Sequence, residues 1–418
     1  MRTLDIIRPD HSTPAWERLE WLIVGGGLHG VHAALRLITE AGVAPNRLLI
    51  VDPAPSLFAR WRERTGALAM TYLRSPAVHN LGRHPDSLHR FAGKRRNRPL
   101  DLFAQPYNRP SVRLFDEHCD TLVDDLNLSD RHLTAKVSRI VPHEDRVAIE
   151  TAAGTTIESA RLLLATGPGR PAEHPAWYGD VAKRVERILD PGYRWTEGTA
   201  GESVAVVGGG MTAAHTALRL ASEGARVHVI ARHAVRERQF DSSPGWLGPK
   251  YMAGFERCAS WQARRSKIDA ARYRGSITPD LQYALNPGLR NGKIQWHVDH
   301  VDAASPTSDG LELRLASAAS LGVQRAILCT GFAPGPPSPG LIDSLAQEAG
   351  LPRSECGFPV IDRALRWHPR IHVSGALAEL RLGPTARNIA GARRTGDLLV
   401  ESLAEPPALE LGKLRKMA

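Results

Sequence analysis

The chain has 418 residues, a net charge of +10 and a hydrophobic share of 42%. That length is sufficient for two or three domains, each with its own core. Residues 1–20 contain no apolar run of the signal-peptide type, and no stretch of about 18 apolar residues could span a membrane. We therefore expect a cytoplasmic protein with no membrane partner.

The positive charge is spread along the chain. The densest basic run, Gly93–Pro99, is short and lacks interleaved aromatic residues, which is typical of a solvated loop rather than a nucleic-acid site. No cysteines form a C-x-x-C pair, and none lies at metal-ligand spacing from a histidine. We expect no nucleic-acid partner, no metal and no dithiol redox centre from the four cysteines, Cys119, Cys258, Cys329 and Cys356.

The first pattern in chain order is a strand, a helix and a strand within residues 20–52. WLIV is a short buried strand, GVHAALRLITEAG has the apolar spacing of a helix that ends at Gly42, and RLLIVD is the next strand. Residues 53–110 carry many turn residues and predict an irregular segment, followed by a helix over 111–128. Short alternating segments over 133–167 predict a β-meander.

The strand, helix and strand return over residues 203–231, in VAVV, AAHTALRLASEG and RVHVIA. Residues 232–291 are polar and predict an irregular segment. Within it, a basic helix from Trp261 to a turn at Gly275 is expected to be a solvated helix on the second unit, with a substrate gate and an oligomer contact as the alternatives. Residues 370–403 predict a strand, a loop and a long helix.

Two similar phrases, LLLATGPG and AILCTGFAP, each consist of an apolar strand followed by Thr-Gly. One precedes the second strand–helix–strand unit and the other follows it, as expected for a nucleotide domain inserted into another. We predict an α/β fold with two Rossmann-like dinucleotide-binding domains. Residues 1–170 and 326–418 would form one domain, and residues 200–325 the inserted one.

The glycine-rich turn of the first unit, which we call the first finger, contains Gly25, Gly27 and Gly30. These glycines match G-x-G-x-x-G between a strand and a helix. Such glycines permit a tight turn, close approach of a pyrophosphate and helix–strand packing, and the helix N-terminus offers free N–H groups. Asp52 ends the next strand at the offset of an acid that bonds ribose hydroxyls. These features predict FAD, and a glycine-rich turn without a ligand is the structural alternative.

The second finger contains Gly208 and Gly210, with Ala213 in the third place. Its strand ends in Ala231 instead of an acid, and Arg232 follows. An arginine pairs with the 2′-phosphate that a carboxylate would repel. The second finger therefore predicts NADPH rather than NADH, and a solvated arginine is the alternative.

Four stretches carry a family resemblance: VAVVGGGMTAAHTALRL, MTYLRSPAVHNLGRHPDSLHRFA, NRPSVRLFDEHCDTLV and FDSSPGW. They resemble the NADPH finger, the flavin-wrapping segment, a helix entry and a segment beside the NADPH site of the microbial ornithine and lysine N-hydroxylating monooxygenases. The resemblance covers most of the chain. It implies that NADPH reduces FAD, that reduced FAD and O₂ give a C4a-hydroperoxide, and that its distal oxygen passes to a small nucleophile, most often an amine nitrogen.

The chain departs from that family in its substrate residues. The family's Asn after the segment resembling FDSSPGW has no counterpart, and its substrate-binding Lys corresponds at best to Arg74. The flavin chemistry is expected to carry over, whereas ornithine or lysine as the substrate is not.

Several residues are predicted to form the site. Arg74 would hold a substrate carboxylate or the flavin, and His79 would relay a proton; a surface arginine and a structural histidine are the alternatives. The loop LGPTARN would open the last helix and aim N–H groups at the flavin. The predicted cofactor-binding set is Gly25, Gly27, Gly30, Asp52, Trp61, Val137, Thr166, Gly167, Gly208, Gly210, Thr212, Arg232, Gly375, Gly383, Pro384 and Thr385.

An NADPH-dependent flavin reductase or oxidase and an S-oxygenating monooxygenase remain open alternatives with the same fold. The missing C-x-x-C pair disfavours a disulfide reductase, and two intact fingers disfavour a non-catalytic redox sensor. We expect a small-molecule substrate and O₂ as partners. The sequence leaves open the substrate, the role of residues 255–290 and whether copies of the chain assemble into a homo-oligomer.

Overall fold

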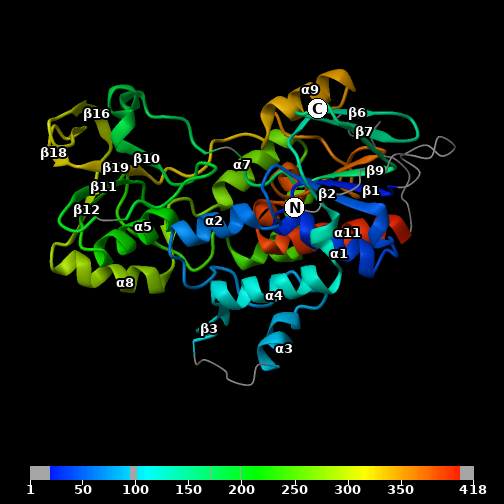
Figure 1. Ribbon diagram of the computed structural model, residues 1–418, viewed down its shortest axis with the longest axis horizontal. Coiled ribbons are helices and arrows are strands. Elements are labelled where there is room, and N and C mark those ends of the chain that lie inside the picture. The colour runs from blue at the N-terminus through cyan, green and yellow to red at the C-terminus, as the bar shows by residue number, and fades with distance from the viewer. Residues whose placement is uncertain (1–18, 95–100, 170, 198, 405–418) are drawn as a thin grey trace.

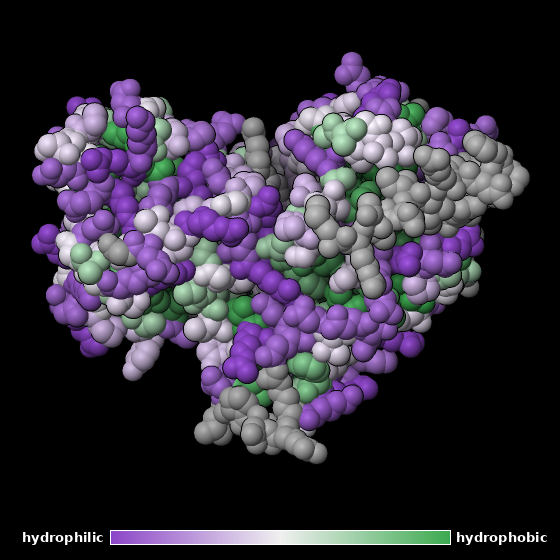
Figure 2. Space-filling model, viewed as in Figure 1, coloured by the Kyte–Doolittle hydropathy of each residue, from purple (hydrophilic) through white to green (hydrophobic). Residues whose placement is uncertain are grey.

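A computed structural model describes residues 19–94, 101–169, 171–197 and 199–404. Residues 1–18 and most of the basic run Gly93–Pro99 therefore lie outside the described residues. The chain forms two lobes, each built around a mainly parallel sheet (Figure 1). On the face seen in Figure 2, hydrophilic residues predominate over both lobes, and a notch separates the lobes at the upper edge.

The first lobe contains a sheet of six strands in the order β20-β21-β9-β1-β2-β5, parallel except for the β20–β21 pair. β1 is buried along its whole length, and β2 and β9 each bury three residues, so the core of the lobe lies at the centre of this sheet. The strands are β1 (Trp21–Val24), β2 (Leu48–Asp52), β5 (His132–Thr134), β9 (Arg161–Leu164), β20 (Arg366–His368) and β21 (Ile371–Val373).

The second lobe contains a parallel sheet of five strands in the order β10-β19-β11-β12-β15. All its strands lie in sequence between β9 and β21, so the second unit is inserted into the first, and the predicted fold class is confirmed. The strands are β10 (Val185–Arg187), β11 (Ser203–Val207), β12 (Arg226–Ala231), β15 (Ile294–Val298) and β19 (Arg325–Leu328).

The predicted domain limits differ slightly from the sheets. β10 lies ahead of the predicted start at residue 200, and β19 runs past the predicted end at residue 325. Each lobe also carries an antiparallel three-stranded meander, which precedes β9 in the first lobe and β19 in the second. The expected meander over 133–167 is therefore too long, because β5 and β9 belong to the parallel sheet. The meander strands are β6 (Val137–Pro142), β7 (Val147–Thr151), β8 (Thr156–Ser159), β16 (Val301–Pro306), β17 (Leu311–Leu315) and β18 (Ser320–Val323).

Helices α1 (Leu28–Thr39) and α11 (Ile389–Ala404) lie side by side under the first sheet (Figure 1). Gly396 allows this approach, because a Cβ there would lie 2.9 Å from the His32 ring. Arg36 of α1 donates to Asp397 of α11 at 2.7 Å. In the second lobe, α5 (Met211–Ser222) and α8 (Pro279–Arg290) cover the corresponding face.

The prediction of an irregular segment over 232–291 is wrong outside the helix expected from Trp261, because most of the segment is helical. α6 (Pro249–Glu256), α7 (Trp261–Ala271) and α8 follow one another there. The buried face of each of the first two helices consists of only a few apolar residues. They are Met252 and Phe255 in α6, and Trp261 and Ile268 in α7. α7 packs on α10 (Glu379–Leu382) of the first lobe and is not a solvated helix of the second.

The segment 53–115 lies between the lobes and below them in Figure 1. It is less irregular than expected, since apolar residues of its helices join the core of the first lobe. Its elements are α2 (Ala59–Ala67), α3 (Ser87–Gly93), the short pair β3 (Phe103–Ala104) and β4 (Arg109–Pro110), and the first residues of α4 (Val112–Asp125).

Candidate active site: two glycine fingers and the junction between them

The first finger, residues 25–30, joins β1 to α1 in a turn that requires glycine at two positions. Gly25 has a φ of +118°, and a Cβ built on it would lie 2.2 Å from the carbonyl oxygen of Ala165. A Cβ on Gly30 would lie 1.9 Å from the oxygen of Gly25. Gly27, the N-cap of α1, has open space around it. The turn is therefore closed toward the protein and open at Gly27, where a pyrophosphate would approach.

Asp52 holds the first finger in place with both oxygens of its carboxylate. Oδ2 accepts a hydrogen bond from the N–H of Gly26 at 2.7 Å, and Oδ1 accepts one from the N–H of Ala54 at 2.8 Å. A carboxylate has about four lone-pair sites, so both oxygens keep capacity for ribose hydroxyls. Val137 starts β6 close by, two residues after Ala135, whose N–H donates to the carbonyl oxygen of Asp52 at 3.0 Å.

The second finger, residues 208–213, repeats this geometry between β11 and α5. Gly208 has a φ of +141°, and its Cβ would lie 2.4 Å from the carbonyl oxygen of Cys329. Gly210 is the N-cap of α5, and Thr212 is half-buried in the first turn. Ala213 occupies the third finger position and is fully buried. Both fingers thus fit a dinucleotide at the carboxyl end of their strands.

The end of β12 differs from the end of β2. Ala231 is buried, and Arg232 is exposed without a side-chain partner among the described residues. His233 Nδ1 donates to the carbonyl oxygen of Ala234 at 2.8 Å. The His233 ring lies against the finger, since a Cβ built on Gly209 would be 3.0 Å from it. The side chain of Arg232 is therefore free to pair with a phosphate.

Arg74 is committed to contacts within the protein. Its guanidinium donates to the carbonyl oxygens of residues 238–240 and to Ser276 Oγ, at 2.7–2.9 Å. These bonds fasten the segment 53–115 to the second lobe. These bonds occupy Nε and Nη2 of Arg74, and its role toward a substrate carboxylate or the flavin stays a prediction.

Trp61 and His79 lie in the same segment. Trp61 Nε1 donates to Asp116 Oδ1 at 2.8 Å, which anchors the indole on α4. Burial and, after it, the charge of Arg393 lower the pKa of His79. A lowered pKa keeps the imidazole neutral near pH 7, where it can accept a proton. The roles of Trp61 in cofactor binding and of His79 in proton relay stay predictions.

Two loops of the first lobe lie beside the first finger. Thr166 and Gly167 follow β9, and Thr166 Oγ1 is buried with no hydrogen-bond partner among the described residues. Gly375 has a φ of +63°, and a Cβ there would lie 3.5 Å from the ring of His29 in the first finger. An unpaired buried hydroxyl beside a glycine-lined turn fits a polar ligand such as the sugar–phosphate chain of FAD.

Gly383, Pro384 and Thr385 are buried in a separate short turn. The prediction that they open the last helix is wrong, because the 3₁₀ turn η7 (Pro384–Arg387) ends before α11 begins at Ile389. Gly383, with a φ of +76°, starts the turn, and extended Asn388 ends it. The N–H groups predicted to face the flavin thus belong to η7.

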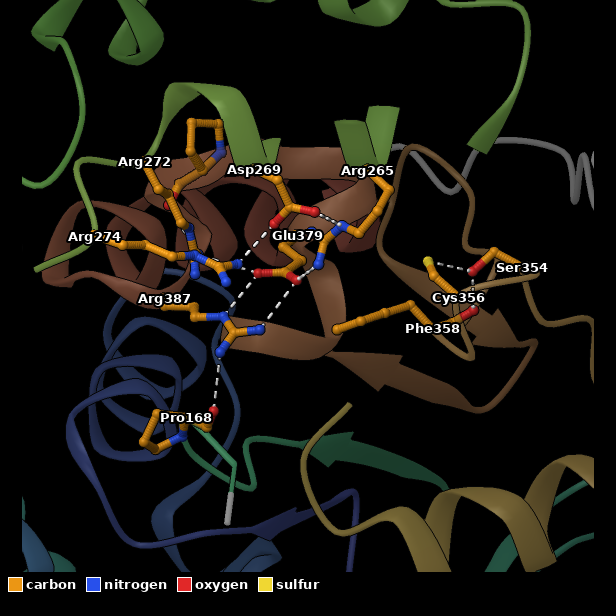
Figure 3. A network of polar contacts seen from close by, with 11 residues as sticks. Pro168, Arg265, Asp269, Arg272, Arg274, Ser354, Cys356, Phe358, Glu379 and Arg387 are labelled. Atoms are coloured by element: carbon orange, nitrogen blue, oxygen red, sulfur yellow. Dashed lines mark hydrogen bonds and ion pairs between the residues drawn. The ribbon is translucent and has the colours of Figure 1, made fainter. Parts of the chain in front are cut away.

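A buried cluster of charge lies behind η7, and we call it the Glu379 cluster: Glu379, Arg265, Arg272 and Arg387 (Figure 3). Burial alone would raise the pKa of Glu379, but the hydrogen bonds of Arg387 and the charges of the three arginines outweigh it and lower the pKa. Arg387 also donates to the carbonyl oxygen of Pro168 at 3.0 Å, and Arg272 to that of Pro384 at 3.2 Å. The cluster therefore joins α7 to loops of the first lobe.

The segment FDSSPGW lies at the same junction. Asp241 Oδ1 accepts a hydrogen bond from Asn388 at 3.1 Å, and its carbonyl oxygen accepts one from the N–H of Tyr273 at 2.7 Å. Gly275 lies two residues after Tyr273 and next to the second finger, because a Cβ built on Gly210 would be 3.4 Å from the Cα of Gly275. The second finger, residues 241–275 and the start of α11 are therefore contiguous.

Sequence reasoning missed the Glu379 cluster. The available signal was a glutamate within the apolar run GALAELRLGP, where a buried acid requires cationic partners. Among the described residues, no group of three or more metal-ligating side chains could hold an ion. No helix in the described part of the chain has the length and apolar character needed to cross a membrane.

Comparisons with solved structures show the fold. Ornithine hydroxylase from Pseudomonas aeruginosa is similar with a TM-score of 0.71 and 17% identity, over 92% of this chain and 98% of that one. The FAD-bound cadaverine monooxygenase from Erwinia amylovora has a TM-score of 0.69 and 14% identity, over 94% and 95%. Bacillithiol disulfide reductase from Bacillus cereus has a TM-score of 0.60 and 18% identity, over 93% and 99%. The predicted resemblance to N-hydroxylating monooxygenases is confirmed at the level of the fold.

Among curated proteins, no sequence matches this chain significantly. The family model described as pyridine nucleotide-disulphide oxidoreductase matches residues 19–244, which is more than half of the chain. The matched region includes the first finger, the segment 53–115 and the second finger. The chain therefore belongs to the pyridine nucleotide-disulphide oxidoreductase family and is a flavin-dependent oxidoreductase.

Proposed function

We propose that the protein is an FAD-dependent, NADPH-consuming monooxygenase that transfers one oxygen atom of O₂ to a small nucleophilic substrate, with an amine nitrogen as the favoured acceptor. The observation that carries the proposal is the pair of fingers, which share their glycine geometry but differ in Asp52 and Arg232 at the strand ends. FAD binds at the first finger and NADPH at the second.

The residues around the first finger bind FAD, and the residues around the second finger bind NADPH. Bound FAD supplies the redox and oxygen chemistry, so the protein has to bind, orient and shield it. Asp52 accepts ribose hydroxyls, and Arg232 pairs with the 2′-phosphate of NADPH. The FAD side is completed by Gly25, Gly27, Gly30, Trp61, Val137, Thr166, Gly167, Gly375, Gly383, Pro384 and Thr385, and the NADPH side by Gly208, Gly210 and Thr212.

The domain division follows the two sheets. The described residues between 19 and 169 and between 329 and 404 form the FAD domain, and the described residues between 185 and 328, from β10 to β19, form the NADPH domain. The segment 53–115 belongs to the FAD domain and is tied to the NADPH domain by Arg74. Arg109 makes a second tie, because its guanidinium lies 3.0 Å from Asp280 of α8.

Oxygen transfer is favoured over disulfide reduction because the chain has no C-x-x-C pair, and its fold is that of ornithine and cadaverine monooxygenases. An NADPH-dependent flavin reductase or oxidase is the second candidate, since a bacillithiol disulfide reductase shares the fold. Sulfur as the oxygen acceptor is the third.

The deciding experiment is rapid reoxidation. The yellow protein is reduced with NADPH without air, mixed with oxygenated buffer, and followed by flavin absorbance and by hydrogen peroxide release. A spectral species that precedes the oxidised spectrum and persists for seconds supports oxygen transfer, and panels of amines and thiols then identify the acceptor. Direct return to the oxidised spectrum with one peroxide per flavin, in the presence of those panels as well, would identify a reductase or oxidase.

A further inference from the structure

The Glu379 cluster contains more positive than negative charge in a nearly closed environment. The Glu379 side chain is 0% exposed, and those of Arg265, Arg272 and Arg387 are 13%, 14% and 17% exposed. Arg387 Nε lies 2.7 Å and Arg272 Nη2 3.1 Å from Glu379 Oε2, and Arg265 contacts Oε1. Three guanidinium groups thus share one carboxylate.

Neighbouring acids do not remove this surplus. Asp269 lies 2.7 Å from Arg274, which is outside the cluster. Its distance to Arg265 is longer, at 3.9 Å (Figure 3). Asp269 is shared with Arg274, and Asp241, which also acts on Arg272, is shared with Arg74, so the three arginines of the cluster keep a surplus of positive charge. Guanidinium groups remain protonated in proteins, and water screens such enclosed charges weakly.

The cluster is one hydrogen bond away from both loops assigned to FAD. Arg387 donates to the carbonyl oxygen of Pro168, which directly follows Thr166 and Gly167. Arg272 donates to the carbonyl oxygen of Pro384 in η7. The positive potential of the cluster therefore acts on a ligand held between these loops, although the arginines need not touch it.

Resting on the proposed FAD site, we propose that the surplus charge of the Glu379 cluster tunes the reduction potential of FAD by stabilising its negatively charged reduced form. Reduction by NADPH transfers a hydride, so FAD + NADPH gives FADH⁻ + NADP⁺. The flavin ring gains two electrons and one proton, and hence one negative charge. A buried positive potential lowers the free energy of that anion and leaves the neutral oxidised ring largely unaffected.

The test is the reduction potential of FAD in the holoenzyme, measured by equilibration with a redox dye. Arg272→Gln is expected to lower the potential, with at least a tenfold smaller ratio of reduced to oxidised FAD, or about 30 mV for a two-electron couple. Glu379→Gln is expected to raise it, and Arg272→Lys to keep the wild-type value. Arg274→Gln is the matched control, because it removes the same charge from a side chain that is 63% exposed.

The signs of these shifts decide the proposal. Equal shifts in Arg272→Gln and Arg274→Gln, or a lowered potential in Glu379→Gln, would overturn it. If Glu379→Gln fails to fold, the reduction potentials of Arg265→Gln and Arg265→Lys are compared instead, because Arg265 reaches the cluster from α7. A yellow protein with the expected shifts but no oxygenated product overturns only the monooxygenase proposal. A yellow protein with unmoved potentials overturns only the tuning, and a chain that takes up no FAD overturns both.

Discussion

The two fingers agree at their first glycine, where packing sets the geometry, and differ at the third position, where Ala213 replaces Gly30, and at the strand ends that follow. Gly25 faces the carbonyl oxygen of Ala165, and Gly208 faces that of Cys329. Each carbonyl follows the parallel strand next to the finger, so the same packing forbids a side chain at both glycines. At the strand ends the packing makes no such demand, and there Asp52 and Arg232 differ in charge.

The largest expected effect comes from breaking the shared geometry. Gly25→Ala and Gly208→Ala should each lower the free energy of unfolding by about 3 kcal/mol, because a Cβ meets a backbone carbonyl and φ is positive. Urea denaturation measures the loss. Gly66→Ala is the control, since no atom lies within 4 Å of its Cβ. A loss in one finger alone would show that the two turns are not equivalent.

The next effect is a shared sensitivity to acid. Burial lowers the pKa of His32 in α1 to about 3 and that of His215 in α5 to about 4. The unfolded chain binds these protons near pH 6.5, so stability is complete above that pH and falls as pH drops toward 4. At pH 5, each of the two histidines should lower the free energy of unfolding by about 2 kcal/mol relative to its value above pH 6.5.

Denaturation curves at pH 7.5 and pH 5 measure this effect. His32→Gln should reduce the pH dependence even where it lowers the absolute stability. A pH dependence that stays the same in His32→Gln would contradict the assignment of the proton to α1.

A smaller effect tests the strand end of the second finger. Arg232→Ala should weaken NADPH binding about 10- to 100-fold, the range of a lost charge-assisted hydrogen bond, and leave NADH within about twofold. Titration of both nucleotides measures the ratio. Arg226→Ala is the control, because Arg226 is exposed at the other end of the same strand. Equal losses for NADPH and NADH would remove the 2′-phosphate argument.

The strand end of the first finger should respond less. Asp52→Ala is expected to weaken FAD binding about tenfold, through lost ribose contacts and loss of the bond to Gly26. Asp52→Asn keeps one acceptor oxygen and should lie between Asp52→Ala and the wild type. The flavin content of the purified proteins reports the outcome, and full occupancy in Asp52→Ala would count against the FAD assignment.

The smallest effect on stability is expected at Gly27. Because a Cβ there meets no atom within 4 Å, Gly27→Ala should change the free energy of unfolding by less than about 0.5 kcal/mol. FAD binding should still weaken, because the added methyl group would lie where the pyrophosphate approaches. Both quantities are measured on the same preparation of Gly27→Ala. An unchanged FAD affinity would show that the pyrophosphate does not bind at Gly27.

The fingers were predictable from sequence because their demands are local. A strand, three spaced glycine positions and the residue at the next strand end all lie within about 30 residues, the span of one such unit. The insertion was predictable from the repeated Thr-Gly phrase. The meander limits, α6 and α8 were not predicted, and the helix predicted from Trp261, α7, was expected on the other lobe. Each of these helices buries only two apolar residues, which gives a weak periodic pattern.

The junction between the lobes could not be predicted. Arg74 resembles a substrate ligand in sequence, and only the folded chain shows the backbone oxygens of residues 238–240 around it. The partners of Glu379 lie as far as 114 positions away. Tertiary packing brings such distant residues together, so the sequence shows that a buried Glu379 requires cationic partners but not which residues they are.

The position of β21 has a consequence for synthesis on the ribosome. β21 pairs with β9, yet it emerges only after every strand of the second sheet, which is complete at Leu328. Domains fold as units while the chain grows, so the inserted lobe has all its strands before the first sheet can close. The lobe that is begun first is thus finished last, and its nascent β9 edge waits for the C-terminal segment that also brings η7 and α11.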